Sequence, residues 1–407
     1  MRHHRARPFA VFLCLSLLAV EGAAGGVEPG PGRSEPAVLS ARLAAAQAGD
    51  PDAQFAIAVA YHQGEGLPAD LDAAVRWYEA AARQGHAQAQ NNLGVRYLYG
   101  EGVPVSEDRA LAWFRRSAEN GFADGQFNYA TMLTTGRGTS VDEDAATYWF
   151  TRAAEQGFPE AQLALYERLR KGIGAPADLA AALAWLEKAA AQGHAVAERE
   201  LGLALLDDEA GSPRPGAALL LLKRSAAQGN LDAAWQVGHV LALGLAGSPD
   251  AAGAVEWFRH AAEAGHPAAQ NALGLALLLG EGIAADPAAA AEWFGRAAEA
   301  EYPMALFNLG VLHLEGRGVP HDMREALRLL GRAAELGYAP AQNNLGIIYA
   351  QGLGVSPDLV TGYKWLVVAA ANGHPTAGQT LGDLSPHLTD QQMELAKAQA
   401  RQWAPIP

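Results

Sequence analysis

Two helical patterns joined by a turn make up residues 86–121, which read HAQAQNNLGVRYLYGEGVPVSEDRALAWFRRSAENG. In the first pattern Ala89, Leu93 and Tyr97 recur every four residues, so they form an apolar stripe on one face of a helix. The segment 100–104 then carries two glycines and a proline, which end a helix. The order of these signals predicts a helix–turn–helix hairpin.

The second helix of this hairpin is expected to begin after Ser106, because a serine oxygen can accept the free N–H groups of a first helical turn. We expect Trp113 to be a buried core residue of this helix. Gly121 would end it in the left-handed conformation that glycine adopts without strain. Gly94 lies beside the apolar stripe of the first helix, where its missing side chain allows close approach of a second backbone.

The hairpin pattern returns every 36 residues. The closing glycine recurs at Gly49, Gly85, Gly121, Gly157, Gly193, Gly229, Gly265, Gly337 and Gly373, with Glu301 in the one remaining place. The tryptophan recurs at Trp77, Trp113, Trp149, Trp185, Trp257, Trp293 and Trp365. The place of Ser106 is taken by Asp70, Asp142, Asp178, Asp250, Asp286, Asp322 and Asp358. No insertion breaks the register between residues 50 and 373, so these residues contain nine repeats. One hairpin cannot bury both of its apolar faces, so neighbours must stack, which predicts an all-α, right-handed α-solenoid.

The repeat resembles the Sel1-like repeat family, a relative of the tetratricopeptide repeats. The shared motif is Leu-Gly-x-x-Tyr-x-x-Gly-x-Gly-Val, followed by Asp, Ala, Trp and Ala-Ala-x-x-Gly. Its best copies begin at Leu93, Leu273, Leu309 and Leu345, and the resemblance covers residues 50–373. It implies a solenoid that binds other proteins, with partners in envelope signalling, secretion or virulence.

Both ends of the array are expected to be capped, because a solenoid needs polar-backed ends to stay soluble. Residues 25–49 predict a linker and a capping helix over 38–49. We expect residues 374–407 to form a half-repeat and a final capping helix. The capping-box pattern from Thr389 to Gln392 marks the start of that helix.

The repeat at 194–229 departs most from the pattern. An acidic segment, 207–211, replaces its Gly-x-Gly turn, and Arg214 replaces the capping aspartate. The two prolines of segment 212–215 are expected to shorten or delay its second helix. Two interpretations stay open, namely drift of a tolerant middle repeat and an acidic docking loop or bend.

Residues 1–24 predict a signal peptide. Three arginines precede the uncharged apolar run 9–20, and small residues at 22–24 suit a cleavage site. A retained N-terminal anchor is the alternative. No other long apolar run follows, so we expect no integral membrane segment after signal removal. The arginine-rich, alanine-rich composition is typical of bacteria, which would place the protein in the periplasm or outside the cell.

Charge and cysteine content exclude several classes of partner and site. The formal net charge of −14 over 407 residues repels nucleic acid and anionic membrane surfaces. Cys14 is the only cysteine, and it lies within the predicted signal peptide. A mature chain would therefore have neither a disulfide nor a thiolate site.

The twelve histidines raise the question of a metal site. His86, His194, His266 and His374 occupy the same place in four repeats, separated by whole repeats. A helical metal pair needs a spacing of about three or four residues, so we expect no metal ligands here. No motif for a nucleophile, a phosphate loop or a cofactor is present. The chain is therefore predicted to be no enzyme and to need no cofactor.

A binding surface is expected on the first helices. In residues 87–99, the positions of Asn92, Arg96 and Tyr99 avoid the apolar stripe, and we predict that they contact a partner. The asparagine recurs at Asn128, Asn308 and Asn344. An amide donates and accepts hydrogen bonds, which suits the backbone of an extended peptide. The alternative is that these asparagines bridge neighbouring helices.

Trp235 is a further candidate contact residue, because it directly follows the irregular repeat. Packing between repeats is the alternative for this side chain. Taken together, these features predict an exported, monomeric scaffold or regulator that binds a protein or peptide on its concave face. A cell-wall-associated module that binds glycan or restrains a cell-wall hydrolase is the alternative function.

Overall fold

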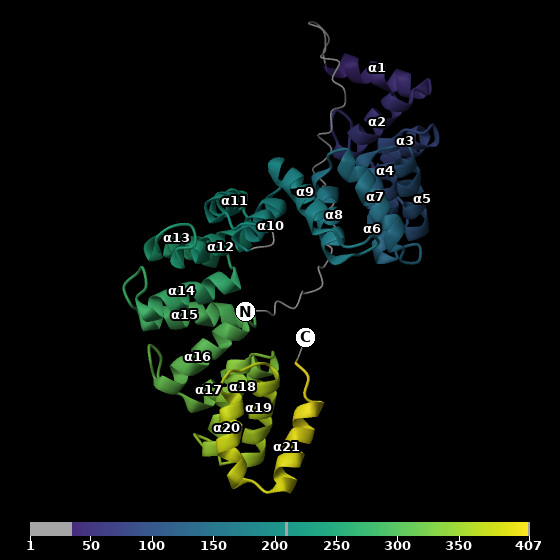
Figure 1. Ribbon diagram of the computed structural model, residues 1–407. Coiled ribbons are helices and arrows are strands. Elements are labelled where there is room, and N and C mark those ends of the chain that lie inside the picture. Colours follow the sequence, from purple (N-terminus) through teal and green to yellow (C-terminus); the bar gives the residue numbers. More distant parts are fainter. Residues whose placement is uncertain (1–34, 208–210, 406–407) are drawn as a thin grey trace. The chain divides into compact units, whose positions relative to one another are not determined.

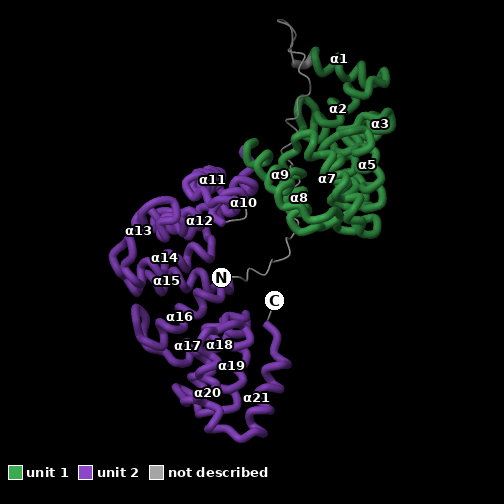
Figure 2. The backbone as a smooth tube through the Cα atoms, in the orientation of Figure 1, with its two compact units in different colours: residues 1–192 green, residues 193–407 purple. Residues whose placement is uncertain are grey.

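The computed structural model describes residues 35–207 and 211–405, and in them it contains helices and no strand (Figure 1). The predicted signal peptide, residues 1–24, lies outside the described residues. The helices form two compact units, of which the first ends at Gln192 and the second begins at Gly193 (Figure 2).

The bounds of the helices repeat with the period of the sequence. In unit 1 they are α1 Glu35–Gln47, α2 Pro51–Gln63, α3 Leu71–Arg83, α4 Ala87–Tyr99, α5 Glu107–Glu119, α6 Ala123–Thr135, α7 Glu143–Glu155, α8 Pro159–Lys171 and α9 Leu179–Ala191. In unit 2 they are α10 Ala195–Leu206, α11 Pro215–Ala227, α12 Leu231–Ala242, α13 Ala251–Glu263, α14 Pro267–Leu279, α15 Pro287–Glu299, α16 Pro303–Glu315, α17 Met323–Glu335, α18 Ala339–Gln351, α19 Leu359–Ala371, α20 Ala377–Leu384, the 3-10 helix η3 Ser385–His387 and α21 Asp390–Gln402.

Each repeat is one hairpin of a first helix (α2, α4 and so on to α18) and a second helix (α3, α5 and so on to α19). The all-α solenoid of nine tandem hairpins is thereby confirmed. Helix α1 begins 36 residues before α3, so it is a lone second helix, although it starts at Glu35 rather than at residue 38. Helix α21 begins with the predicted capping box of Thr389 and Gln392.

The predicted N-caps of the second helices are also confirmed. Asp70 Oδ1 accepts the N–H of Ala73 at 2.8 Å, and Ser106 Oγ accepts that of Arg109 at 3.4 Å. The other six aspartates of this series make the same contact. Local hydrogen bonding at these caps therefore favours the observed start of eight of the nine second helices, α11 being the ninth.

The tryptophan prediction needs correction, because Trp113 is only half-buried. The next residue, Phe114, is 1% exposed, and it fills the core between the two helices of the hairpin. A Cβ atom on Gly94 would lie 2.7 Å from Cδ1 of the Phe114 ring. The glycine of the first helix thus makes room for this ring, and the same contact joins Gly238 to Phe258.

The irregular repeat is more regular than its sequence suggested. Helix α11 has the usual 13 residues and starts 36 residues after α9, so the prediction of a shortened or delayed helix is wrong. Pro215 occupies the first helical position, where a missing N–H costs nothing and the ring favours the helical φ. Residues 208–210 of the predicted acidic loop lie outside the described residues.

Glu301 occupies the place of the closing glycine, and it carries a strained backbone. Its φ of 55° is the one positive φ among the described residues other than glycine. Such a conformation costs a side-chain-bearing residue about 1–2 kcal/mol. Its exposed carboxylate accepts from Arg332 at 2.6 Å, and solvent weakens this ion pair at the surface.

We therefore expect Glu301→Gly to raise the free energy of unfolding by about 0.5–1 kcal/mol in urea titrations. Arg332→Ala serves as the control, because it removes the ion pair and leaves the strain. A lower urea midpoint for Glu301→Gly than for the parent protein would show that the ion pair outweighs the strain.

Candidate binding surface on the first helices

A buried ladder of glutamines holds consecutive repeats together. Gln90 Nε2 donates to the carbonyl oxygen of Ala82 at 3.0 Å, and its Oε1 accepts from Asn120 Nδ2 at 2.8 Å. One glutamine in each of six repeats donates in this way: Gln54, Gln90, Gln126, Gln162, Gln270 and Gln342. In these six repeats the ladder ties the first helix to the preceding repeat.

The outer side chains of a first helix lie at positions that differ in one place from the predicted positions 92, 96 and 99. In α4 they are Asn92, Val95 and Tyr99, whereas Arg96 is only 6% exposed. Its equivalents Met132, Leu312 and Ile348 are buried as well. We call the outer positions of α4 and their equivalents in the other first helices the first-helix face.

The expected exposure of Arg96 is thus corrected, and the reason is packing between repeats. Met132 of α6 belongs to the core cluster of α3, α4 and α5, so this position packs on the preceding hairpin. The Nη1 of Arg96 lies 2.6 Å from Oε2 of Glu101 and 2.6 Å from Nε2 of His62. Burial and the nearby guanidinium both lower the pKa of His62. Arg96 is therefore held by its own neighbours.

The asparagines are half-buried and differ in what they contact. Asn128 Nδ2 donates to Asn91 Oδ1 at 2.8 Å, and Asn308 Nδ2 donates to Asn271 Oδ1 at the same distance. These two amides therefore bridge neighbouring first helices, yet they stay partly accessible. Asn92 makes two long contacts: its Nδ2 donates to the hydroxyl of Tyr78 at 3.5 Å, and its Oδ1 accepts from Asn91 Nδ2 at 3.4 Å.

Asn344 makes no side-chain hydrogen bond to another residue of the described chain. Some asparagines of the row thus bridge neighbouring helices, and all four stay partly accessible to a partner. The role of this asparagine row in binding stays a prediction.

The two aromatic candidates lie in different surroundings. Tyr99 is 41% exposed at the end of α4, on the first-helix face. Trp235 is half-buried in α12, with its ring 4.8 Å from the ring of His239 and 5.8 Å from that of His266. Its indole N–H is buried and finds no acceptor among the described residues. Tyr99 is therefore the more accessible of the two.

Unit 2 places an apolar row beside the amide row. Leu275, Val311 and Ile347 follow one another at 36-residue spacing on α14, α16 and α18. Leu275 is 36% exposed, and the other two are half-buried. Each lies three residues after the amide position of its helix, which holds asparagine in α16 and α18, so the two rows run side by side. Amides can bind a peptide backbone while the apolar row receives its side chains.

The family model described as Sel1 repeat matches nine consecutive segments: 51–86, 87–122, 123–158, 159–194, 195–230, 231–266, 267–302, 303–338 and 339–374. The chain belongs to the Sel1 repeat family. It is similar to a Sel1 repeat protein from Oxalobacter formigenes, at 34% identity over 76% of this chain and 89% of the other, with a TM-score of 0.60. It is also similar to a protective antigen with an SLR fold from uropathogenic Escherichia coli strains. That likeness has 30% identity over 90% of this chain and 87% of the other, with a TM-score of 0.59. No curated protein sequence matches the chain.

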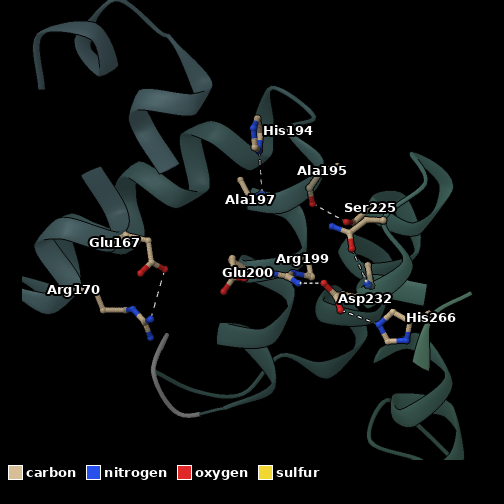
Figure 3. Close-up of polar contacts among 12 residues, drawn as sticks. Glu167, Arg170, His194, Ala195, Ala197, Arg199, Glu200, Ser225, Asp232 and His266 are labelled. Carbon is tan, nitrogen blue, oxygen red and sulfur yellow. Dashed lines mark hydrogen bonds and ion pairs between the residues drawn. The ribbon is translucent and has the colours of Figure 1, made fainter. Parts of the chain in front are cut away.

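The repeated histidines cap first helices of the Sel1 repeats. Nδ1 of His86 accepts the N–H of Ala89 at 3.1 Å, and His194 and His266 make the same bond. Figure 3 shows His266 joined to Asp232 at 3.0 Å and Asp232 joined to Arg199 at 2.7 Å. The hydrogen bond from His266 is the main cause that lowers the pKa of Asp232. These contacts link α10, α12 and α14.

Within residues 35–207 and 211–405 of the Sel1 repeat protein, no group of three or more histidine, cysteine, aspartate or glutamate side chains could hold a metal ion. In the same residues, no helix is long and apolar enough to cross a membrane.

The Sel1 repeat solenoid is expected to lose stability as the pH falls. Burial of the ring is the main cause that lowers the pKa of His86 below 6.5, against the opposing charge of Asp52. The unfolded chain therefore takes up this proton first. The stability is fully present above about pH 6.5 and is lost as the pH falls through the folded pKa.

Urea midpoints measured between about pH 7.5 and about pH 5.5 test this expectation. His86→Asn should flatten the decline, because Asn230 already caps Ala233 at 3.0 Å at the equivalent place. The exposed His260→Asn is the control and should leave the decline unchanged. An equal decline in all three proteins would contradict the assignment to His86.

Proposed function

We propose that this Sel1 repeat protein is an exported scaffold that binds a protein or a peptide along its first-helix face. The Sel1 repeat solenoid itself suggests a scaffold for protein–protein interaction. The paired rows of α14, α16 and α18 carry the rest of the proposal, because they offer hydrogen-bonding amides beside accessible apolar side chains. A surface of this kind suits an extended segment of a partner.

Two features support a partner on this face. Exposed apolar side chains lie along it, including Leu275 and Leu279 in unit 2. Tyr99 is exposed on it in unit 1, and aromatic residues contribute strongly to protein interfaces. Export is proposed from the charged and apolar pattern of residues 1–24.

Matched pairs of variants test the proposed face. The first protein carries Tyr99→Ala and Leu279→Arg, at positions 41% and 58% exposed on first helices. The control carries Tyr148→Ala and Leu220→Arg, at positions 57% and 60% exposed on second helices. Both variants change the same residue types, and neither removes a buried side chain. Residues 25–407 of each protein are used in pull-downs from envelope extract.

The proposal is supported if a protein retained by the parent and by the control is lost from the first-helix variant. Loss from the control alone would place the binding face on the second helices and contradict the proposal. A further variant, with alanine at Asn92, Asn128, Asn308 and Asn344, tests the amide row separately. Circular dichroism and urea titration would show first that each variant is folded.

A further inference from the structure

Unit 2 contains a cavity of about 520 Å³ near the C-terminal end of the array. It lies between α18, α19 and the short helix α20, which are labelled close together in Figure 1, and His387 of η3 also lines it. Its lining residues include Ile347, Ala350, Leu359, Leu366, Asp383 and Leu384. Ile347 belongs to the apolar row of the first-helix face, so the cavity continues that row.

The cavity arises because the repeat pattern is incomplete at this end. In earlier repeats the Gly-x-Gly turn packs on the start of the preceding second helix. A Cβ on Gly102, for example, would lie 2.6 Å from the carbonyl oxygen of Leu71. Helix α20 ends after 8 residues at Leu384, and the 3-10 helix of Ser385–His387 follows in place of that turn. The start of α19 at Leu359 is therefore left as a wall of the cavity.

The chemistry of the cavity is apolar with an acidic rim. Ile347, Leu359, Leu366 and Leu384 supply apolar walls, and the exposed Asp383 is the one carboxylate among its lining residues. Concave sites of about 300–1,000 Å³ with apolar walls and few polar groups are typical of ligand sites.

A second observation at this end is an unsatisfied amide. Asn343 is 6% exposed, and its Oδ1 has no hydrogen-bond partner among the described residues. It lies one helical turn from Ile347 on α18. The equivalent oxygens of Asn91 and Asn271 accept from an asparagine of the following repeat. Thr380 stands at that place here, so this buried oxygen receives no hydrogen bond from the following repeat.

We propose that the cavity binds one large apolar side chain of a peptide segment of the partner, with an adjacent lysine or arginine paired to Asp383. This inference rests on the proposed function, because the segment would continue from the rows of α14, α16 and α18. Charge complementarity selects a basic neighbour, since Asp383 faces the site and the chain carries a net charge of −14.

The probe for a test is the fluorescein-labelled peptide Gly-Ser-Ala-Trp-Arg-Ala-Ser-Gly, titrated with residues 25–407 by fluorescence anisotropy. We expect saturable binding that weakens at least ~10-fold when the peptide tryptophan becomes alanine or its arginine becomes glutamate. Asp383→Lys should reverse the preference between the arginine and glutamate peptides. Glu292→Lys, an equal charge change on the exposed face of the second helix α15, should leave that preference unchanged.

A variant that fills the cavity tests the apolar contribution to peptide binding separately from the contribution of the Asp383 charge. Ala350→Phe places a ring among the lining residues, and we expect it to abolish binding of the tryptophan peptide while the urea midpoint confirms folding. The inference is overturned by the absence of saturable binding up to about 1 mM, or by equal affinities for the tryptophan and alanine peptides. It is also overturned if Asp383→Lys and Glu292→Lys behave alike. If the peptide experiment fails while the first-helix variants still lose their partner, the cavity is rejected as a binding site and the proposed function still holds.

Discussion

Phe114→Ala is expected to lower the free energy of unfolding by about 3–5 kcal/mol, the usual cost of truncating a buried phenylalanine. The ring is 1% exposed and fills the space that Gly94 leaves on the neighbouring helix. Removal would open a cavity inside one hairpin, and the rigid backbone around Gly94 could close it only in part. Hydrogen exchange of the amides of α4, α5 and α6, together with urea unfolding, would measure the loss.

The control for this prediction is Trp113→Ala on the same helix. Trp113 is half-buried, and the guanidinium of Arg116 lies 4.6 Å from its ring, so much of the indole is already at the surface. We expect roughly half the loss seen for Phe114→Ala, since the lost free energy scales with the buried apolar area. In a quasi-linear stack the effect should be strongest in adjacent repeats. A larger loss for Trp113→Ala would contradict the burial described above.

Arg224→Ala is expected to lower the free energy of unfolding by about 3 kcal/mol, because it leaves a buried carboxylate without its cation. Glu198 is 0% exposed and stands where other repeats have the ladder glutamine. The guanidinium of Arg224 contacts its Oε1, and Gln228 Nε2 donates to its Oε2 at 2.8 Å. The ion pair therefore replaces part of the neutral amide ladder in this repeat.

The rescue variant for this prediction carries Glu198→Gln together with Arg224→Ala. A neutral glutamine restores the residue type of Gln90 and removes the buried charge, so most of the lost stability should return, to within about 1 kcal/mol of the parent. Urea titrations of the parent, the single variant and the double variant make the comparison. A double variant as unstable as Arg224→Ala alone would show that Arg224 acts through packing of its side chain and not through its charge.

Part of the candidate surface could be predicted from the sequence. The row of Asn92, Asn128, Asn308 and Asn344 was visible from its period, and so was the exposed Tyr99. The predicted exposure of Arg96 is wrong because the residues three and four places after Asn92 lie on the same side of an isolated helix, and periodicity alone does not distinguish them. Packing of the neighbouring hairpin decides between them, and it buries Arg96 while Val95 stays half-buried.

The burial of the ladder glutamines could not be predicted from the sequence either. Its spacing of 36 residues was present in the sequence, yet glutamine is usually a surface residue. Gln90 is buried because the carbonyl of Ala82 and the amide of Asn120 satisfy both ends of its side chain. Both partners become known only when the adjacent helices are in place, so the sequence shows the period of the glutamines but not their role.

The sequence by itself determined the number of repeats, the N-caps at Asp70 and Ser106, and the turns closed by glycine, because each depends on backbone preferences within a few residues. Only the tertiary structure decided that Phe114 rather than Trp113 is core, that Arg96 is inside, and that a cavity opens beside Leu359. Those features depend on which side chains the neighbouring hairpin brings into contact. Local periodicity marks a helix face, and close packing between repeats decides which part of that face is left for a partner.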